Sequence, residues 1–188
     1  MADEIFSVFP EIFTERLVLR EIKQEDAESI YKLRSNPEVA RYETFKPYTN
    51  IKQAEDTIKW FSDDYKNKKA ITWGISLKES HEIIGILHCE IEIPKVRADF
   101  GYDLRPEYWN KGIMTETVKA LLDFTFNKID VYRIESAVST QNYGSARVLE
   151  KSGFIKEGIL RKRSFLGGSL HDMIFFSILK DEYFSVCE

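Results

Sequence analysis

The sequence has little cysteine, little histidine and no excess of positive charge. Its 188 residues include two cysteines, Cys89 and Cys187, and three histidines. Two distant cysteines form neither a CxxC metal motif nor a disulfide framework, so we expect a cytoplasmic protein without a metal. With 27 Lys and Arg against 31 Asp and Glu, the formal net charge of −4 argues against nucleic-acid binding through the overall field.

Long apolar runs and low-complexity tracts are also missing. No uninterrupted apolar stretch approaches the roughly 18–20 residues of a membrane span, and acidic residues stand at the start where a signal peptide carries basic ones. We therefore expect no membrane partner. Only 9 Gly and 5 Pro occur, which excludes a collagen-like or largely disordered chain. Because domains cluster near about 100–150 residues, we also expect one domain over residues 1–188.

Hydrophobic periodicity and turn residues predict an alternation of strands and helices. Pro37 is expected to stop the first helix, and Asn50 with Gln53 forms a capping box before the second. The Pro94-Lys95 pair separates two strands, and Gly167-Gly168 predicts a final hairpin. The expected elements are a strand over 14–22, helices over 24–38 and 51–65, an antiparallel meander of strands over 70–78, 81–93 and 96–104, a helix from 113, a strand over 132–140, a helix from 143, and strands over 155–165 and 169–179.

The strand over 81–93 has two different faces. Its odd positions from Ile83 to Ile93 are apolar, which predicts a face that meets a helix along its whole length. The even positions change from Ile84 and Ile86 to His88, Glu90 and Glu92. This second face therefore leaves the core and enters either solvent or a cleft.

Residues 109–115, Trp-Asn-Lys-Gly-Ile-Met-Thr, lie between a strand and the start of a helix. Unpaired backbone N–H groups and the helix dipole favour an anion at such a place, usually a phosphate. Gly112 allows close approach of a ligand, Lys111 adds a positive charge and Thr115 a hydroxyl. An ordinary strand-to-helix turn would also explain the single glycine.

Asn142 and Ser145 occupy the N-cap and N3 positions of the later helix. Capping explains Asn142 without any chemistry. Ser145 lies one turn inside the helix, where a hydroxyl has little structural purpose, so it is the better candidate for contact with a ligand.

Together, the order of elements and three segments resemble the GCN5-related N-acetyltransferase (GNAT) family, most closely its RimJ/RimL-like branch, which modifies protein N-termini. The segments are WNKGIMTETVKALLDFTF, NYGSARVLEKSGF and LHDMIFFSILKDEY. The resemblance covers residues from about 14 to 183. It implies an α/β (α+β) fold with a mixed, mostly antiparallel, splayed sheet and about four helices, and acetyl-CoA bound between the strand ending near Leu104 and the strand over 134–139.

The resemblance also implies which residues bind acetyl-CoA. The family's pyrophosphate turn, Arg/Gln-x-x-Gly-x-Gly/Ala, falls on Trp109-x-x-Gly112-x-Met114, where Trp109 and Met114 depart from it. Binding there uses mainly backbone N–H groups, so the departures weaken the motif more than the chemistry. The backbone of Asp103 and Leu104 would pair with the pantetheine arm. The cofactor-binding candidates are Asp103, Leu104, Trp109, Asn110, Lys111, Gly112, Ile113, Met114, Thr115, Asn142 and Ser145.

Catalytic candidates follow from the same resemblance. Many GNAT enzymes carry a tyrosine seven residues after the asparagine to protonate the thiolate, but Leu149 stands there, so Ser145 becomes the candidate hydrogen-bond donor. Asp99 matches the glutamate of the branch's Ala-Glu-Ile-Gly-Tyr motif and is the candidate base. Glu90, acting through water, is the alternative, although either carboxylate also suits a solvated strand face.

The acceptor candidates are a protein or peptide N-terminus, which the branch favours, and a small amine such as a polyamine, amino acid or aminoglycoside. A non-catalytic acyl-CoA-binding domain is a further hypothesis. Tyr42, Phe45 and His88 are the candidate substrate-binding residues. His171-Asp172 is interpreted as a structural pair that fixes the last hairpin, and exposed edge strands near the C-terminus would allow a homodimer.

Overall fold

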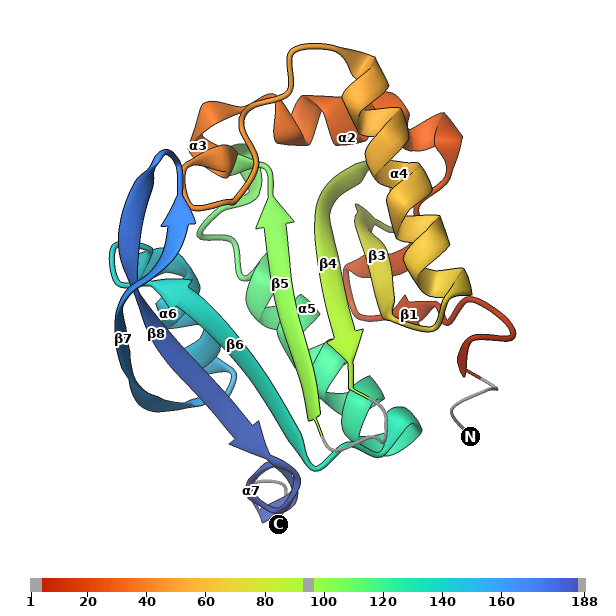
Figure 1. The fold of residues 1–188 in the computed structure, drawn as a ribbon. Coiled ribbons are helices and arrows are strands. Elements are labelled where there is room, and N and C mark those ends of the chain that lie inside the picture. The colour runs from red at the N-terminus through yellow and green to blue at the C-terminus, as the bar shows by residue number, and fades with distance from the viewer. Residues whose placement is uncertain (1–4, 93–96, 186–188) are drawn as a thin grey trace.

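An eight-stranded mixed sheet runs through the middle of the protein (Figure 1). The computed structural model describes residues 5–92 and 97–185. The strands lie in the order β1-β2-β3-β4-β5-β6-β8-β7, and only the β5–β6 pair is parallel within the described sheet. The strands are β1 (Ile12–Phe13), β2 (Leu17–Glu21), β3 (Ala70–Leu77), β4 (Ile83–Ile91), β5 (Arg97–Leu104), β6 (Arg133–Ser139), β7 (Ile155–Leu166) and β8 (Ser169–Leu179).

Helices cover both faces of this sheet. Ile30 and Ile58, from two N-terminal helices, pack with Ile86 on one face, whereas Val118 and Leu149 belong to the larger core on the other. The described part of the chain holds the helices α2 (Ala27–Arg34), α3 (Pro37–Ala40), α4 (Ile51–Lys66), α5 (Ile113–Phe124), α6 (Tyr143–Lys151) and α7 (Lys180–Ser185), with 3₁₀ turns at Gln24–Asp26 and Pro106–Tyr108 and a π turn at Thr125–Ile129. None of these helices combines the length and apolarity that a membrane span requires.

Two short helices, α3 and α7, make the difference between the expected four helices and the six observed in the described residues. The helix before Pro37 stops at Arg34, as expected, and Pro37 itself begins α3. Proline suits the first helical position because the N–H group that it lacks has no partner there. The side chain of Asn36 caps α3 by accepting a hydrogen bond from the Glu38 N–H group.

The predicted meander is confirmed as β3, β4 and β5, while the Pro94-Lys95 turn lies outside the described residues. The expected face assignment of β4 was wrong at its start. Ile75 pairs with Gly85 but Ser76 pairs with Ile83, so one residue of β4 bulges out of register. A bulge reverses the in-and-out alternation. Ile83 therefore packs under α2 and α4, opposite the face that carries Leu87 and the residues after it.

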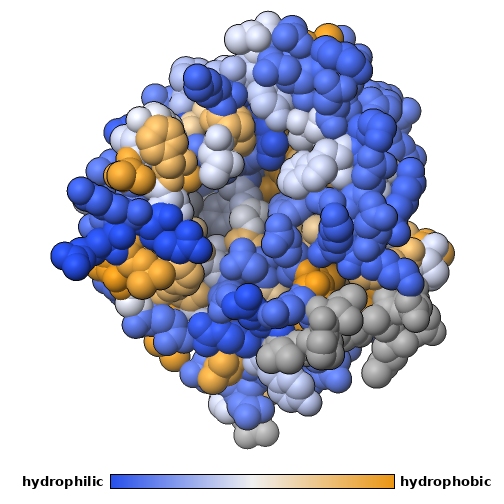
Figure 2. All heavy atoms as spheres, in the orientation of Figure 1, coloured by the Kyte–Doolittle hydropathy of each residue, from blue (hydrophilic) through white to orange (hydrophobic). Residues whose placement is uncertain are grey.

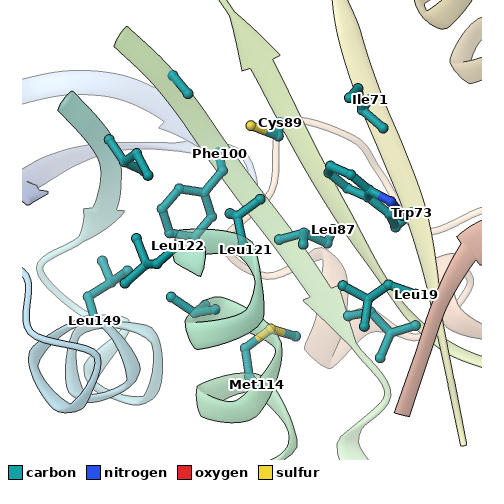
Figure 3. Close-up of a cluster of buried hydrophobic side chains, with 14 of the residues drawn as sticks. Leu19, Ile71, Trp73, Leu87, Cys89, Phe100, Met114, Leu121, Leu122 and Leu149 are labelled. Atoms are coloured by element: carbon teal, nitrogen blue, oxygen red, sulfur yellow. The ribbon is translucent and has the colours of Figure 1, made fainter. Parts of the chain in front are cut away.

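The larger core lies between the sheet and α5 (Figure 3). Phe100 from β5 points toward Leu121 and Leu122 of α5 in this view, and all three are buried. Cys89 lies in the same core, where burial raises the pKa of its thiol far above the ordinary value. The thiol is therefore unsuited to act as a nucleophile.

Local signals at the ends of elements are confirmed. The capping box before α4 forms as predicted, because the Asn50 side chain accepts from the N–H group of Gln53. The β7–β8 hairpin turns at Gly167 and Gly168, whose φ angles are +54° and +89°. In β8, His171 Nδ1 and Nε2 lie 2.8 Å from the hydroxyls of Ser139 and Ser169, in agreement with a structural role.

Candidate active site

A cavity opens where β5 and β6 separate. The two strands pair only at residues 97–99 and 133–135, and Ser136 Oγ then donates to the Phe100 carbonyl oxygen at 2.7 Å. Beyond this point the strands diverge (Figure 1), and the cavity of about 510 Å³ lies at the divergence. Its lining residues come from 38–43, 102–104, 108–115 and 141–151. A hollow is visible at this place in Figure 2, with both hydrophilic and hydrophobic residues on its rim.

The register of β5 determines which backbone groups face this gap. Arg105 N–H donates to the Ile84 carbonyl oxygen on β4, whereas the Phe100 carbonyl oxygen accepts on the opposite side. Because backbone groups alternate along a strand, those of Asp103 point toward β4, and those of Tyr102 and Leu104 point into the gap. Contrary to expectation, the backbone of Asp103 is therefore turned away from the gap, and that of Tyr102 faces it.

The N-terminus of α5 forms one wall of the cavity. Gly112 is its N-cap with φ +76° and ψ 0°, and among the described residues no side chain caps this helix end. Its first N–H groups, those of residues 113–115, therefore remain available to an anion. Arg16 holds the turn from outside by donating to the Lys111 carbonyl oxygen at 3.0 Å and to Glu116 Oε2 at 2.7 Å.

Side chains of the turn divide between structural and ligand-facing positions. Trp109 Nε1 donates to the Leu104 carbonyl oxygen at 2.7 Å, which ties the turn to the end of β5. The side chains of Ile113 and Met114 are buried in the core, so these two residues offer only backbone N–H groups to a ligand. Trp109 and the candidates Asn110 and Thr115 line the cavity, as Gly112, Ile113 and Met114 also do.

The Lys111 ammonium does not lie along the cavity. Its Nζ is 5.6 Å from the ring centroid of Tyr108, over the ring face. Positive charge on the cavity wall comes instead from Arg41 and, on α6, from Arg147 and Lys151, none of which the sequence interpretation selected. The spacing of four residues between Arg147 and Lys151 places both on one side of the helix, and this regular spacing was the signal available in the sequence.

The N-terminus of α6 carries the two predicted polar residues. Asn142 Oδ1 accepts from Ser145 N–H at 3.1 Å, so the capping role is confirmed, and both side chains line the cavity. The Tyr102 hydroxyl lies 3.4 Å from the Ser145 carbonyl oxygen and also interacts with the Ser145 side chain. Leu149 is fully buried (Figure 3), so a tyrosine at this position would need a different packing to reach the cavity.

This wall of the cavity suits acetyl-CoA. An uncapped helix N-terminus beside Arg147 and Lys151 matches a diphosphate, and the unpaired edge of β5 offers backbone groups to an extended amide arm. Asn142 and Ser145 face the same space from α6.

Carboxylates gather at the opposite wall. Asp103 is buried and accepts from Arg34 Nε at 3.2 Å and from Nη2 at 3.0 Å. Glu43 lines the cavity close to this ion pair. Burial raises the pKa of Glu43 well above its ordinary value, the charge of Asp103 adds to this, and Arg34 opposes it. Sequence reasoning missed Glu43, although it selected the adjacent Tyr42, which does line the cavity.

The predicted bases lie elsewhere on the sheet. Asp99 and Glu90 are paired neighbours on β5 and β4, and neither lines the cavity. Asp99 precedes Asp103 by four residues, or about 13 Å along the strand. The Asp99 side chain is exposed on one side and partly desolvated by its neighbours in the sheet. This desolvation raises its pKa to about 6, and the negative charges of Glu135 and Glu90 add to the effect.

Two of the three predicted substrate-binding residues also lie off the cavity. The ring of Phe45 packs against the guanidinium of Arg34, 4.5 Å from its centroid. His88 stacks on Trp60 at 5.6 Å and bonds through Nδ1 to Thr72 Oγ1 at 2.7 Å. Burial lowers the pKa of His88, which favours the neutral ring.

Comparisons with known proteins agree with this geometry. The family described as "Acetyltransferase (GNAT) domain" matches residues 16–155. The uncharacterized N-acetyltransferase YoaA of Bacillus subtilis is 37% identical over 174 residues, which are 92% of this chain and 98% of YoaA. The spermidine N(1)-acetyltransferase of Escherichia coli is 26% identical, over 88% of this chain and 87% of the relative.

Among solved structures, the ribosomal-protein-S5-alanine acetyltransferase from Vibrio fischeri superposes with a TM-score of 0.81 at 28% identity. The match covers 93% of this chain and 98% of that one. The resemblance expected from the sequence is thus confirmed at the level of the family. The chain belongs to the GNAT family and is an acetyl-CoA-dependent N-acetyltransferase.

Proposed function

We propose that this enzyme transfers acetyl directly from acetyl-CoA to the α-amine of a protein or peptide N-terminus in the cytoplasm. The observation that carries the proposal is the cavity itself. It joins the uncapped N-terminus of α5 and the cations of α6 to a wall that holds Glu43 and Asp103. A donor with phosphates and an acceptor with an amine would therefore meet in the gap between β5 and β6.

Direct transfer requires the two substrates to be held together, and the residues of the gap suit this task. When bound, acetyl-CoA supplies the acetyl thioester. The Tyr102 N–H group faces the gap, where it can stabilise negative charge on an acyl oxygen. The Ser145 hydroxyl lines the same space and can donate to a departing thiolate.

The energy needed to deprotonate the acceptor favours an α-amine. Its pKa of about 7.7–8.0 leaves about a tenth of it neutral near pH 7, at a cost of about 1.4 kcal/mol. A lysine side chain, with a pKa of about 10.4, costs about 4–5 kcal/mol. An α-amine thus needs only a weak base. The rest of a peptide bound by its N-terminus would extend from the cavity into solvent. The 28% identity to an acetyltransferase of a ribosomal protein supports the same acceptor class.

A small polyamine is the second candidate acceptor. Glu38, Glu43 and Asp103 all line the cavity, while Arg34 neutralises only Asp103 directly. Three carboxylates in one cavity, even beside the cations Arg41, Arg147 and Lys151, suit a molecule with several ammonium groups. The spermidine acetyltransferase among the relatives supports this alternative.

CoA release, followed by thiol detection, tests the proposal. The acceptors are peptides with free N-termini, free lysine, spermidine and an aminoglycoside. We expect turnover with the peptides. Turnover with spermidine alone would mean that the acceptor is a polyamine and not a protein or peptide N-terminus. If acetyl-CoA binds and no acceptor reacts, the proposed function is wrong.

A further inference from the structure

Glu43 belongs to a short strap, residues 41–43, that follows α3 and lines the cavity. The strap is held by backbone bonds at Glu43, whose N–H group donates to Ala40 at 3.1 Å and whose carbonyl oxygen accepts from Gly167 at 3.2 Å. The Tyr42 hydroxyl adds a bond to the Gln141 carbonyl oxygen at 3.0 Å. The backbone that carries Glu43 is therefore anchored to α3, to the β7–β8 hairpin and to the loop before α6.

The charges around Glu43 do not balance. The Arg34 guanidinium donates through Nε and Nη2 to Asp103 and through Nη1 to the Tyr48 hydroxyl. The Phe45 ring packs against one face of the same guanidinium. Arg34 forms no ion pair with Glu43, and within the described residues the Glu43 carboxylate has no hydrogen-bond partner at all. The charge of Arg34 therefore acts on two carboxylates, Glu43 and Asp103, and Arg41, which also lines the cavity, forms no ion pair with either within the described residues.

A half-buried carboxylate without a partner is costly unless a proton or a cation neutralises it. The raised pKa of Glu43 agrees with this situation. An amine that enters the cavity supplies the missing positive charge, and it can exchange a proton with the same carboxylate. The other predicted bases, Asp99 and Glu90, do not line the cavity.

We propose that Glu43 binds the ammonium form of the acceptor and accepts its proton before attack, which makes it a catalytic residue of the proposed reaction. The proposal rests on the proposed function. One N–H proton passes to the Glu43 carboxylate, and the freed lone pair forms the N–C bond with the thioester carbonyl carbon. The C–S bond then breaks, the electron pair leaves on sulfur, and the thiolate takes up the second amine proton.

Two substitutions and two acceptors test this role. Glu43→Gln keeps the size and removes the charge, Glu43→Asp keeps the charge with a shorter reach, and Glu79→Gln removes an exposed carboxylate in the β3–β4 turn as a control. The acceptors are a peptide with a free N-terminus, which is mostly an ammonium ion at pH 7, and hydroxylamine, which is mostly neutral there. Thermal unfolding and the KM for acetyl-CoA report on folding and on donor binding.

We expect Glu43→Gln to lower kcat/KM for the peptide about 10²-fold, the ordinary contribution of a general base, and to change the value for hydroxylamine less than about threefold. Glu43→Asp should recover part of the loss, and Glu79→Gln should match the wild type. Equal losses with both acceptors would mean a structural role only, and an unchanged kcat/KM for the peptide would also overturn the proposal. Absence of turnover by the wild-type enzyme with every amine would instead reject the proposed function.

Discussion

Gly167 connects the stability of the β7–β8 hairpin to the geometry of the acceptor wall, so Gly167→Ala should perturb both. A Cβ atom at this position would lie 2.4 Å from the Arg41 carbonyl oxygen, in the strap. Ordinary contacts are longer by about 1 Å, so the strap would have to move by about that amount. Gly168→Ala is the matched control, because its φ of +89° is also left-handed and no atom lies within 4 Å of the added Cβ.

The left-handed backbone costs alanine about 1–2 kcal/mol at either position. Gly167→Ala additionally strains the bond from Gly167 to Glu43, which is worth about 1 kcal/mol. For a protein of this size, the extra 1 kcal/mol corresponds to a Tm about 2–4 °C below that of Gly168→Ala. A displacement of about 1 Å at the site can cost up to 10²-fold in rate.

We therefore expect Gly167→Ala to lower kcat/KM for the amine at least tenfold while the KM for acetyl-CoA stays constant, as about 1 Å of misplacement implies. Gly168→Ala should leave both kinetic constants near wild type. Thermal unfolding by circular dichroism and steady-state CoA release measure the two effects. If both variants lose the same Tm and Gly167→Ala keeps its activity, the strap does not position the acceptor.

Three further substitutions test other parts of the site. Asp99→Asn should raise Tm at pH 8 and leave it nearly unchanged at pH 4. The folded pKa of Asp99 is about 6 against an ordinary 3.8, so its charge destabilises the fold above pH 6 and the penalty disappears as the pH falls toward 4. A lower Tm at pH 8 would contradict this cause. Trp109→Phe removes the hydrogen bond to the Leu104 carbonyl oxygen, which is worth about 1 kcal/mol. The KM for acetyl-CoA should therefore rise about fivefold, while the KM for the amine should not change. Ser145→Ala should lower kcat about tenfold, the effect of losing one hydrogen bond to a charged group, and an unchanged kcat would leave protonation of the thiolate to water.

The parts of the fold that were predicted depend on neighbours in sequence. The capping box of Asn50 and the N-cap of Asn142 bond to N–H groups three residues away, so the local pattern contains the whole interaction. The hairpin at Gly167 and Gly168 is equally local. The bulge at the start of β4 was not predictable in the same way, because it appears only as a shift in pairing with β3.

The same distinction applies to the site. The turn before α5 and the start of α6 line the cavity, as their motifs predicted. The wall with Glu43 was missed because its partners come from distant places in the chain. Asp103 and Arg34 are 69 residues apart in the sequence. The residues next to each of them do not indicate that its side chain will be buried beside the strap. Asp99 was selected by alignment with a motif, and register and distance place it outside the cavity.

The two departures from the family's pyrophosphate turn have physical explanations in this structure. The Trp109 indole satisfies the Leu104 carbonyl oxygen, a group that faces the gap and that β6 is too far away to bond. Met114 can replace a small residue because its side chain is buried in the core (Figure 3). Neither change affects the left-handed Gly112 or the N–H groups that follow it. Since an anion at a helix N-terminus is bound by backbone N–H groups, the turn keeps its function while two of its three motif positions change.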